Sequence, residues 1–172
     1  ATYYDGQTVT KAEENLVLRS QDFDNGYWTK SGTTVTANSI VAPDSTTTAD
    51  TITSISTTAY IGRAGVSNNT SDTFSIYVKY IDNQWVGLNY GGGASTMVWF
   101  DILNGVVGTE SSGYTGSIVS VTNGWYRITI NGLNVYSSAF LWVVEADNVI
   151  TATASKSVYL WGAQLEQRNT VT

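Results

Sequence analysis

The chain has 172 residues, of which 42% are hydrophobic and 13% are charged, and its formal net charge is -6. This length suits one substantial core, and many Gly, Ser, Thr and Asn residues with few charges favour short strands joined by tight turns. The basic residues are scattered singly, which excludes a positive stripe for nucleic acid, and no long apolar run predicts insertion into a membrane.

Cysteine and histidine are both absent from the sequence. Their absence excludes disulfides, thiolate metal sites, cysteine nucleophiles and Ser-His triads, and it removes the commonest zinc ligand. Any chemistry must therefore rest on carboxylates, hydroxyls, amides and aromatic rings.

Residues 1–14, "ATYYDGQTVTKAEE", are predicted to be a lead-in that links the domain to an upstream segment. They place Asp5-Gly6, a hairpin-like turn, between short β-prone pieces and end in charged residues. The main domain is expected to span residues 15–172.

A series of strand-like runs follows, separated by turn-forming pairs such as Asn-Gly at the spacing typical of sandwiches and barrels. No helical period of useful length is present, so the sequence predicts an all-β domain. The predicted strands are Leu16–Leu18, Thr33–Ile40, Thr47–Ser54, Ala59–Val66, Thr73–Tyr80, Gln84–Tyr90, Thr96–Ile102, Val106–Glu110, Gly116–Val121, Trp125–Asn131, Ser138–Glu145 and Lys156–Glu166.

Alternation within the central strands predicts a core face and an opposite face. In "TFSIYVKY" the residues Phe74, Ile76, Val78 and Tyr80 form the apolar face, and the other strands divide in the same way. The polar and aromatic residues predicted to lie opposite the core, and taken together as one candidate glycan-binding surface, are Tyr77, Lys79, Trp85, Asn89, Trp99, Asp101 and Arg127.

The two tryptophans of this set, Trp85 and Trp99, are exposed on this reading unless another layer covers them. A flat indole matches the C–H face of a sugar ring, and the polar residues beside it can bond sugar hydroxyls or charged substituents. The alternative is a second packed surface, such as a trimer interface. Trp28, Trp125 and Trp161, at strand junctions, are predicted to be structural, and Trp142, in an apolar run, to lie in the core.

Several blocks together resemble a domain that recurs in tail-fibre, tailspike and other virion proteins of tailed bacteriophages. The blocks are "NLVLRSQDFDNGYWTKSGTTVTANSIVAPDSTTTADTI", "FSIYVK", "WFDILNGVVGT", "TNGWYRITI" and "VYLWGAQLE". The first block is also similar to the opening of jelly-roll carbohydrate-binding modules. The resemblance implies a jelly-roll β-sandwich of two antiparallel sheets. It also implies a place on the virion surface, in a tail fibre or as a head decoration, with contact to glycans and other virion proteins, and a homotrimer.

The resemblance also raises a metal site. Some related carbohydrate-binding modules hold a structural calcium between the acid after the first-block Phe, here Asp24, and acids on the last strand. The last strand has Gly162, Ala163 and Gln164 at those places. Two alternatives stay open: a calcium ion held by Asp22, Asp24 and Gln164, or a hydrogen-bonded clasp between the first and last strands without a cofactor.

The sequence therefore predicts a non-catalytic domain that binds surface glycans weakly and in many copies, in host adhesion. The alternative is a purely structural module that trimerises or decorates the particle without a ligand. Catalysis is not expected, because glycosidases need two facing carboxylates and nothing in the spacing singles out a pair such as Asp101 and Glu145.

Overall fold

The computed structural model describes residues 2–4, 7–9 and 14–167. Near the start, β1 (Thr2–Tyr4) and β2 (Gln7–Val9) pair antiparallel in a two-stranded sheet of their own, as the lead-in pattern predicts. The predicted turn at Asp5-Gly6 lies outside the described residues.

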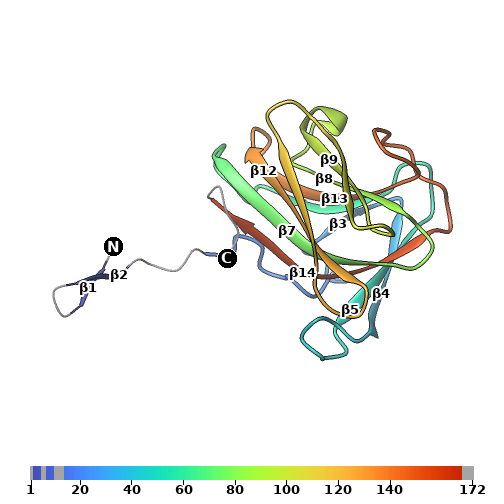
Figure 1. Ribbon diagram of the computed structural model, residues 1–172, viewed down its shortest axis with the longest axis horizontal. Coiled ribbons are helices and arrows are strands. Elements are labelled where there is room, and N and C mark those ends of the chain that lie inside the picture. Colours follow the sequence, from blue (N-terminus) through green and yellow to red (C-terminus); the bar gives the residue numbers. More distant parts are fainter. Residues whose placement is uncertain (1, 5–6, 10–13, 168–172) are drawn as a thin grey trace.

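The domain consists of two six-stranded antiparallel sheets that face each other across one core (Figure 1). We call the sheet with the order β11-β12-β7-β14-β5-β4 the front sheet, and the sheet with the order β10-β9-β8-β13-β6-β3 the back sheet. The strand bounds are β3 Thr29–Ser31, β4 Thr33–Ile40, β5 Ala49–Ser54, β6 Tyr60–Ala64, β7 Ser71–Tyr80, β8 Trp85–Asn89, β9 Met97–Asp101, β10 Val106–Glu110, β11 Thr115–Ser120, β12 Trp125–Leu133, β13 Ser138–Val144 and β14 Ser157–Glu166.

The connectivity is that of a jelly roll. The last strand, β14, lies between β5 and β7 in the front sheet, and the strand before it, β13, lies between β6 and β8 in the back sheet. Strands that are far apart in the sequence thus become neighbours, and every described pairing is antiparallel. The predicted all-β jelly-roll sandwich of two antiparallel sheets is confirmed.

The core forms where the apolar faces of the two sheets meet. The residues assigned to the core by alternation in β7, β8, β9 and β12 are buried, except that Tyr80 and Tyr126 are half-buried and pack against the core. The fully buried ones include Phe74, Ile76, Leu88, Phe100 and Ile128. The prediction of which side chains face inward is therefore confirmed for these strands.

One predicted strand is absent from the structure, and one observed strand was not predicted. Leu16–Leu18 is not a strand, because the Asn15 side chain, and not a continuous backbone ladder, joins this segment to β14. The short edge strand β3 was not predicted, because Thr29–Ser31 follows a run of turns and has too few residues to show alternation.

A four-residue 3-10 turn, η1 (Gly93–Thr96), connects β8 to β9. Among the described residues no helix has the length and apolar character required to span a bilayer.

Candidate functional site

The predicted glycan-binding surface is divided between two opposite sides of the sandwich. Four of its members, Trp85, Asn89, Trp99 and Asp101, belong to the back sheet, whereas Tyr77, Lys79 and Arg127 belong to the front sheet. The expectation of one shared surface is wrong, because alternation shows which residues share a face of one strand but not which sheet contains that strand.

Trp99 is 1% exposed, so the expectation that it presents an open ring is also wrong. Its indole packs with Met97 and Val144, and its Nε1–H donates to the carbonyl of Val149 at 2.7 Å. Asp147, in the same loop, accepts hydrogen bonds from Thr109 on β10. The loop between β13 and β14 therefore covers this part of the back sheet.

Asn89 is fully buried and is used for structure. Its Nδ2 donates to the carbonyl of Gly93, and its Oδ1 accepts the Nε1–H of Trp142 at 3.0 Å. Trp142 is half-buried on the outer face of the back sheet, which differs from the predicted core position.

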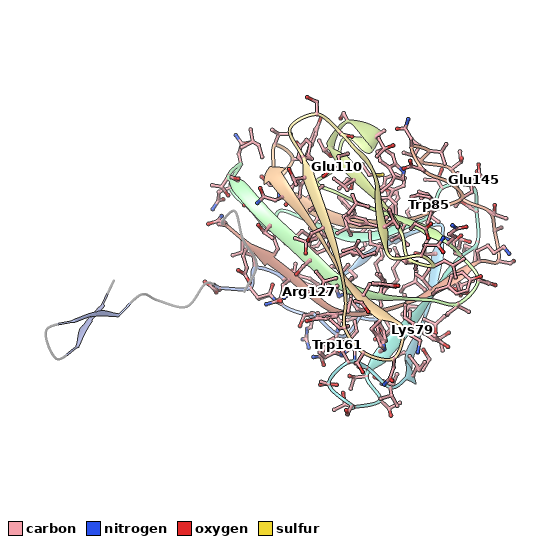
Figure 2. The ribbon with its side chains drawn as sticks, in the orientation of Figure 1. Lys79, Trp85, Glu110, Arg127, Glu145 and Trp161 are labelled. Atoms are coloured by element: carbon pink, nitrogen blue, oxygen red, sulfur yellow. The ribbon has the colours of Figure 1, made fainter. Side chains whose placement is uncertain are left out.

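Asp101 closes the turn between β9 and β10. Its carboxylate accepts the backbone N–H groups of Leu103 and Asn104 and the side-chain amides of Gln84 and Asn104. Burial acts to raise the pKa of Asp101, but these hydrogen bonds outweigh burial and hold the pKa below its ordinary value. Trp85 is half-buried on the same sheet (Figure 2), so of the four back-sheet candidates it alone keeps a partly open ring.

The front sheet brings three of its outward side chains into one row across neighbouring strands. Arg127 on β12 pairs with Tyr77 on β7, which in turn pairs with Trp161 on β14. The Tyr77 and Trp161 ring centroids are 5.3 Å apart with an interplanar angle of 61°, and the Arg127 guanidinium lies 5.5 Å from the Tyr77 centroid. Figure 2 shows Arg127, Trp161 and Lys79 over this sheet.

Lys79 lies in the next row, between Trp125 on β12 and Tyr159 on β14. Trp125 is 1% exposed, and its indole donates to the carbonyl of Val41. Trp28 is also buried, and its indole donates to the carbonyl of Arg19. The structural roles predicted for Trp28 and Trp125 are confirmed.

A β-bulge at Gly162 aligns the aromatic and amide side chains of β14. The register against β7 shifts between Trp161 and Gln164, and Gly162 has φ 64°, a conformation that costs glycine little. The extra residue restores the alternation, so Trp161 and Gln164 both face outward while Ala163 faces the core. Without the bulge, residues three apart would point to opposite sides of the sheet.

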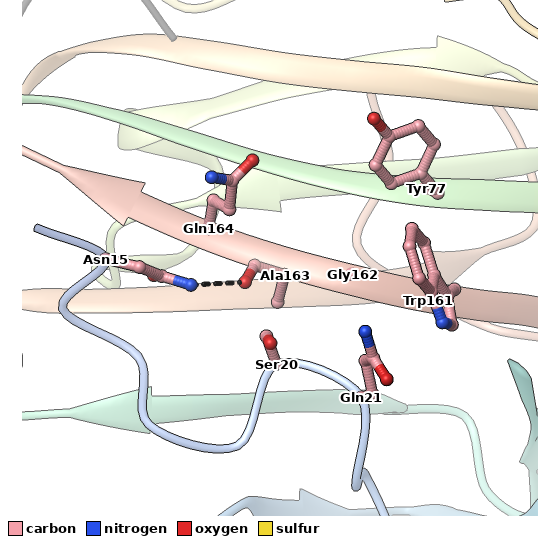
Figure 3. A pocket seen from close by; sticks show the side chains of 8 residues that line it. All are labelled: Asn15, Ser20, Gln21, Tyr77, Trp161, Gly162, Ala163 and Gln164. Atoms are coloured by element: carbon pink, nitrogen blue, oxygen red, sulfur yellow. Dashed lines mark hydrogen bonds between the residues drawn. The ribbon is translucent and has the colours of Figure 1, made fainter. Parts of the chain in front are cut away.

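These residues form the wall of an open pocket of about 260 Å³ at the place where the chain start crosses β14 (Figure 3). Its lining consists of Asn15, Ser20, Gln21, Tyr77, Trp161, Gly162, Ala163 and Gln164. Within the described part of the chain, the side chains of Ser20, Gln21 and Tyr77 make no hydrogen bond to protein, and Gln21 is exposed. The pocket thus combines two rings with free hydroxyl and amide groups.

The sequence predicts a structural role for Trp161 and does not predict that its ring lines a pocket. The missed signal lay in "YLWGAQ", where a glycine interrupts the alternation between an outward Trp and an outward Gln. A glycine inside a strand pattern indicates a bulge. Trp161 is half-buried, and its Nε1–H donates to the Thr48 hydroxyl at 3.0 Å, which fixes the ring.

The residues present do not fit the calcium site. Gln164 accepts a hydrogen bond from Arg127 on the outer face of the front sheet, and Asp22 pairs with Arg19 at 3.7 Å, where both are exposed. In the described ranges no group of three or more acidic side chains is placed to hold a metal ion. The ammonium of Lys30 instead donates hydrogen bonds to a cluster of backbone carbonyls, those of Phe23, Asp24 and Asn25.

The alternative of a hydrogen-bonded clasp agrees with the contacts. The Asn15 Nδ2 donates to the carbonyl of Ala163 at 3.0 Å (Figure 3), and its Oδ1 accepts the backbone N–H of Leu165 at 3.0 Å. Backbone hydrogen bonds from Leu16 to Leu165 and from Ala163 to Ser20 continue the connection. Asn15, and not an acid, is the clasp residue between the start of the domain and its last strand.

No protein-family model matches the chain, and no curated protein sequence matches it.

Solved structures give matches of low sequence identity. The CBM22-1-CBM22-2 tandem domain of Paenibacillus barcinonensis Xyn10C matches with a TM-score of 0.51 and 16% identity, over 96% of this chain and 48% of that one. The CBM22-1 xylan-binding domain of the same protein matches with a TM-score of 0.48 and 17% identity, over 95% of this chain and 100% of that one. The enzymatically active domain of tailspike protein 4 of bacteriophage CBA120 matches with a TM-score of 0.49 and 11% identity, over 90% of this chain and 21% of that one.

This chain therefore spans about a fifth of the tailspike domain and about half of the tandem domain. The likeness to the tandem domain is one of fold. It agrees with the β-sandwich described above, and the chain shares its architecture with a carbohydrate-binding-module domain.

Proposed function

We propose that the chain is a non-catalytic glycan-binding domain and that the pocket on the front sheet is its binding site. The observation that carries the proposal is the pair of rings, Tyr77 and Trp161, that stand 5.3 Å apart in the wall of an open pocket. Aromatic rings beside a few placed polar groups are the usual composition of a small-ligand site.

The lining suits the two surfaces of a sugar. The apolar C–H face of a pyranose packs on an aromatic ring, and its hydroxyls need donors and acceptors together, which amides and hydroxyls supply. Gln21, Ser20 and the Tyr77 hydroxyl have no protein partner among the described residues, so they can bond a ligand without breaking an existing contact. The pocket is smaller than the about 300–1,000 Å³ of drug-sized sites, so it holds one small unit of a longer chain.

A site of this size binds weakly, and weak binding makes sense in many copies. Two rings and a few hydrogen bonds to well-hydrated hydroxyls give roughly millimolar affinity, on the order of -4 kcal/mol. Linking several copies on one particle raises the avidity by roughly 10² to 10⁴. Together with the resemblance of the sequence blocks to phage virion domains, this favours a homotrimeric tail-fibre or head-decoration domain that adheres to host or environmental glycans.

We infer that the pocket does not catalyse hydrolysis of its ligand. Its lining contains no carboxylate, and glycosidic cleavage in most enzymes needs two. The acids considered from the sequence have other partners: Asp101 closes a turn, and Glu145 accepts hydrogen bonds from Thr151 and Thr153. Incubation with a bound polysaccharide should release no reducing ends, and release of reducing ends would contradict this inference.

The experiment is a screen of bacterial surface polysaccharides and xylan with three variants beside the natural chain. Trp161→Ala and Gln21→Ala should abolish or strongly weaken binding, whereas Tyr159→Ala should retain it. Tyr159 is a matched control because it lies on the same strand and face but does not line the pocket. If all three variants bind as tightly as the natural chain, or all three lose binding equally, the pocket is not the glycan-binding site.

A purely structural module is the second candidate, and one observation favours it. Tyr60, Phe140 and Trp142 are half-buried on the outer face of the back sheet, where Tyr60 lies 4.6 Å from Trp142 and 5.4 Å from Phe140 between ring centroids. Such a surface suits packing against a neighbouring subunit. Sedimentation of the natural chain and of Phe140→Ala distinguishes the two, since loss of an oligomer without any glycan ligand would favour the structural role.

A further inference from the structure

The ammonium of Lys30 lies among four backbone carbonyl oxygens. Lys30 belongs to β3, and its Nζ donates to the carbonyls of Phe23 at 3.2 Å, Asp24 at 3.3 Å, Asn25 at 3.0 Å and Trp28 at 3.4 Å. An ammonium has three N–H donors, so these four contacts share them.

The carbonyls converge because residues 19–28 form consecutive turns. The backbone N–H groups of Asp22, Asn25 and Trp28 donate to the carbonyls three residues earlier, which coils the chain tightly. Coiling aims several carbonyl dipoles at one point. Those oxygens repel one another unless a positive charge lies between them.

The coil is held from its other side by a carboxylate. Asp50 is buried, and its Oδ2 accepts the backbone N–H of Phe23 at 2.9 Å while its Oδ1 accepts that of Asn38. Burial raises the pKa of Asp50, in spite of these hydrogen bonds. Asp50 thus bonds the backbone N–H of Phe23 from within the sandwich, and Lys30 bonds four carbonyls on the opposite side of the coil.

The coil begins at the pocket wall. Ser20 and Gln21 line the pocket, and the carbonyl of Ser20 accepts the backbone N–H of Ala163 on β14. If the coil opens, these two side chains lose the position from which they face Tyr77 and Trp161.

We propose that Lys30 is a built-in cation that holds the coil of residues 19–28 and thereby positions Ser20 and Gln21 in the pocket, without a metal ion. The Lys30 ammonium already supplies a positive charge to these carbonyls, at Nζ···O distances of 3.0–3.4 Å. The role in the pocket rests on the proposed function, whereas the role in the coil does not.

The test is hydrogen exchange of the backbone amides of residues 19–28 in Lys30→Ala and in Lys156→Ala. Lys156 is the control because it carries the same charge and has no side-chain hydrogen bond among the described residues; it is half-buried, whereas Lys30 is exposed. Lys30→Ala should lower protection at Asn25 and Trp28 by about tenfold or more, since hydrogen bonds to charged groups are the stronger ones. Lys156→Ala should leave it unchanged.

Chemical rescue tests whether the missing side-chain group itself, and not ionic strength, restores the coil. Propylammonium contains the three carbons and the nitrogen that Lys30→Ala removes, so its chloride should restore part of the protection, and sodium chloride at the same concentration should not. Unchanged exchange in Lys30→Ala would overturn the proposal. A loss that propylammonium and sodium chloride leave equally unrepaired would also overturn it.

The same variants separate this inference from the proposed function. If the natural chain binds a glycan, Lys30→Ala should weaken binding several-fold and propylammonium should restore part of it, whereas undiminished binding would overturn the pocket role of Lys30. If the natural chain binds no glycan, the proposed function fails, and the exchange measurement still decides whether Lys30 holds the coil.

Discussion

The rings of Tyr77 and Trp161 lie opposite each other on β7 and β14 and line one pocket, next to the bulge that Gly162 forms in β14. Their centroids are 5.3 Å apart, and a Cβ built on Gly162 would lie 3.0 Å from Cδ2 of Tyr77. The glycine therefore meets two demands at once, a positive φ of 64° and a close approach of the Tyr77 ring.

Gly162→Ala should destabilise the domain and weaken glycan binding. An alanine at φ 64° is strained, and its methyl group would press on Tyr77, so we expect a loss of about 1–3 kcal/mol in the free energy of unfolding. Urea unfolding measures it. Gly26→Ala is the control, since a Cβ there meets nothing within 4 Å. Equal stability of the two variants would contradict the role of the bulge.

Asn15→Ala should loosen the clasp between the chain start and β14. The variant loses hydrogen bonds to the carbonyl of Ala163 and the N–H of Leu165, at about 1 kcal/mol each. We expect a drop of about 2 kcal/mol in unfolding free energy. Asn68→Ala, at an exposed position without a side-chain hydrogen bond among the described residues, should lose almost nothing. A similar loss in both would exclude the clasp.

Asp101→Asn should reduce stability at neutral pH and flatten its dependence on acid. The folded pKa of Asp101 is lowered, so its contribution is present above the unfolded pKa near 3.8 and is lost as the pH falls through the folded value. The natural chain should therefore lose more stability between pH 5 and pH 2 than the variant does. Urea midpoints across that range measure the difference, and parallel curves would contradict it.

Trp99→Ala should be strongly destabilising without removing the binding site. A fully buried tryptophan truncated to alanine costs about 3–5 kcal/mol through the cavity that it leaves. The fraction that remains folded should bind glycan with unchanged affinity, because Trp99 lies in the back sheet, away from the pocket of the front sheet. If Trp99→Ala is as stable as the natural chain but no longer binds glycan, the prediction from sequence that Trp99 contacts the ligand would be favoured.

Chelation should leave the melting temperature unchanged. The ammonium of Lys30 bonds the backbone carbonyl of Asp24, and the side-chain oxygen of Gln164 accepts a hydrogen bond from Arg127. Both oxygens would have to lose these partners to bind a calcium ion. Melting curves with EDTA and with added calcium chloride test this, and a large shift between them would favour a metal site.

The alternation of residues predicted the fold well because inward and outward side chains repeat every two residues along a strand. It assigned Phe74, Ile76 and Ile128 to the core, where the structure has them. It could not show that Tyr77 and Trp85 lie on opposite sheets, because sheet membership depends on pairings between strands that are far apart in the sequence.

Two other features were beyond the same reasoning. The loop that covers Trp99 has no periodic pattern, so its position depends on tertiary contacts such as the one from Trp99 to Val149. Trp161 was assigned to structure because strand-end tryptophans are commonly core fillers. The structure shows that Trp161 faces outward and lines the pocket, beside the bulge at Gly162.

The most direct test of the binding site is a titration with the best polysaccharide fragment from the screen, followed by the NMR signals of the six tryptophan indole N–H groups. The indole of Trp161 should shift with ligand, together with the side-chain amide of Gln21, while the buried indole of Trp99 should stay unchanged. Shifts confined to Trp85 and Trp142 on the back sheet, with Trp161 unaffected, would contradict the account.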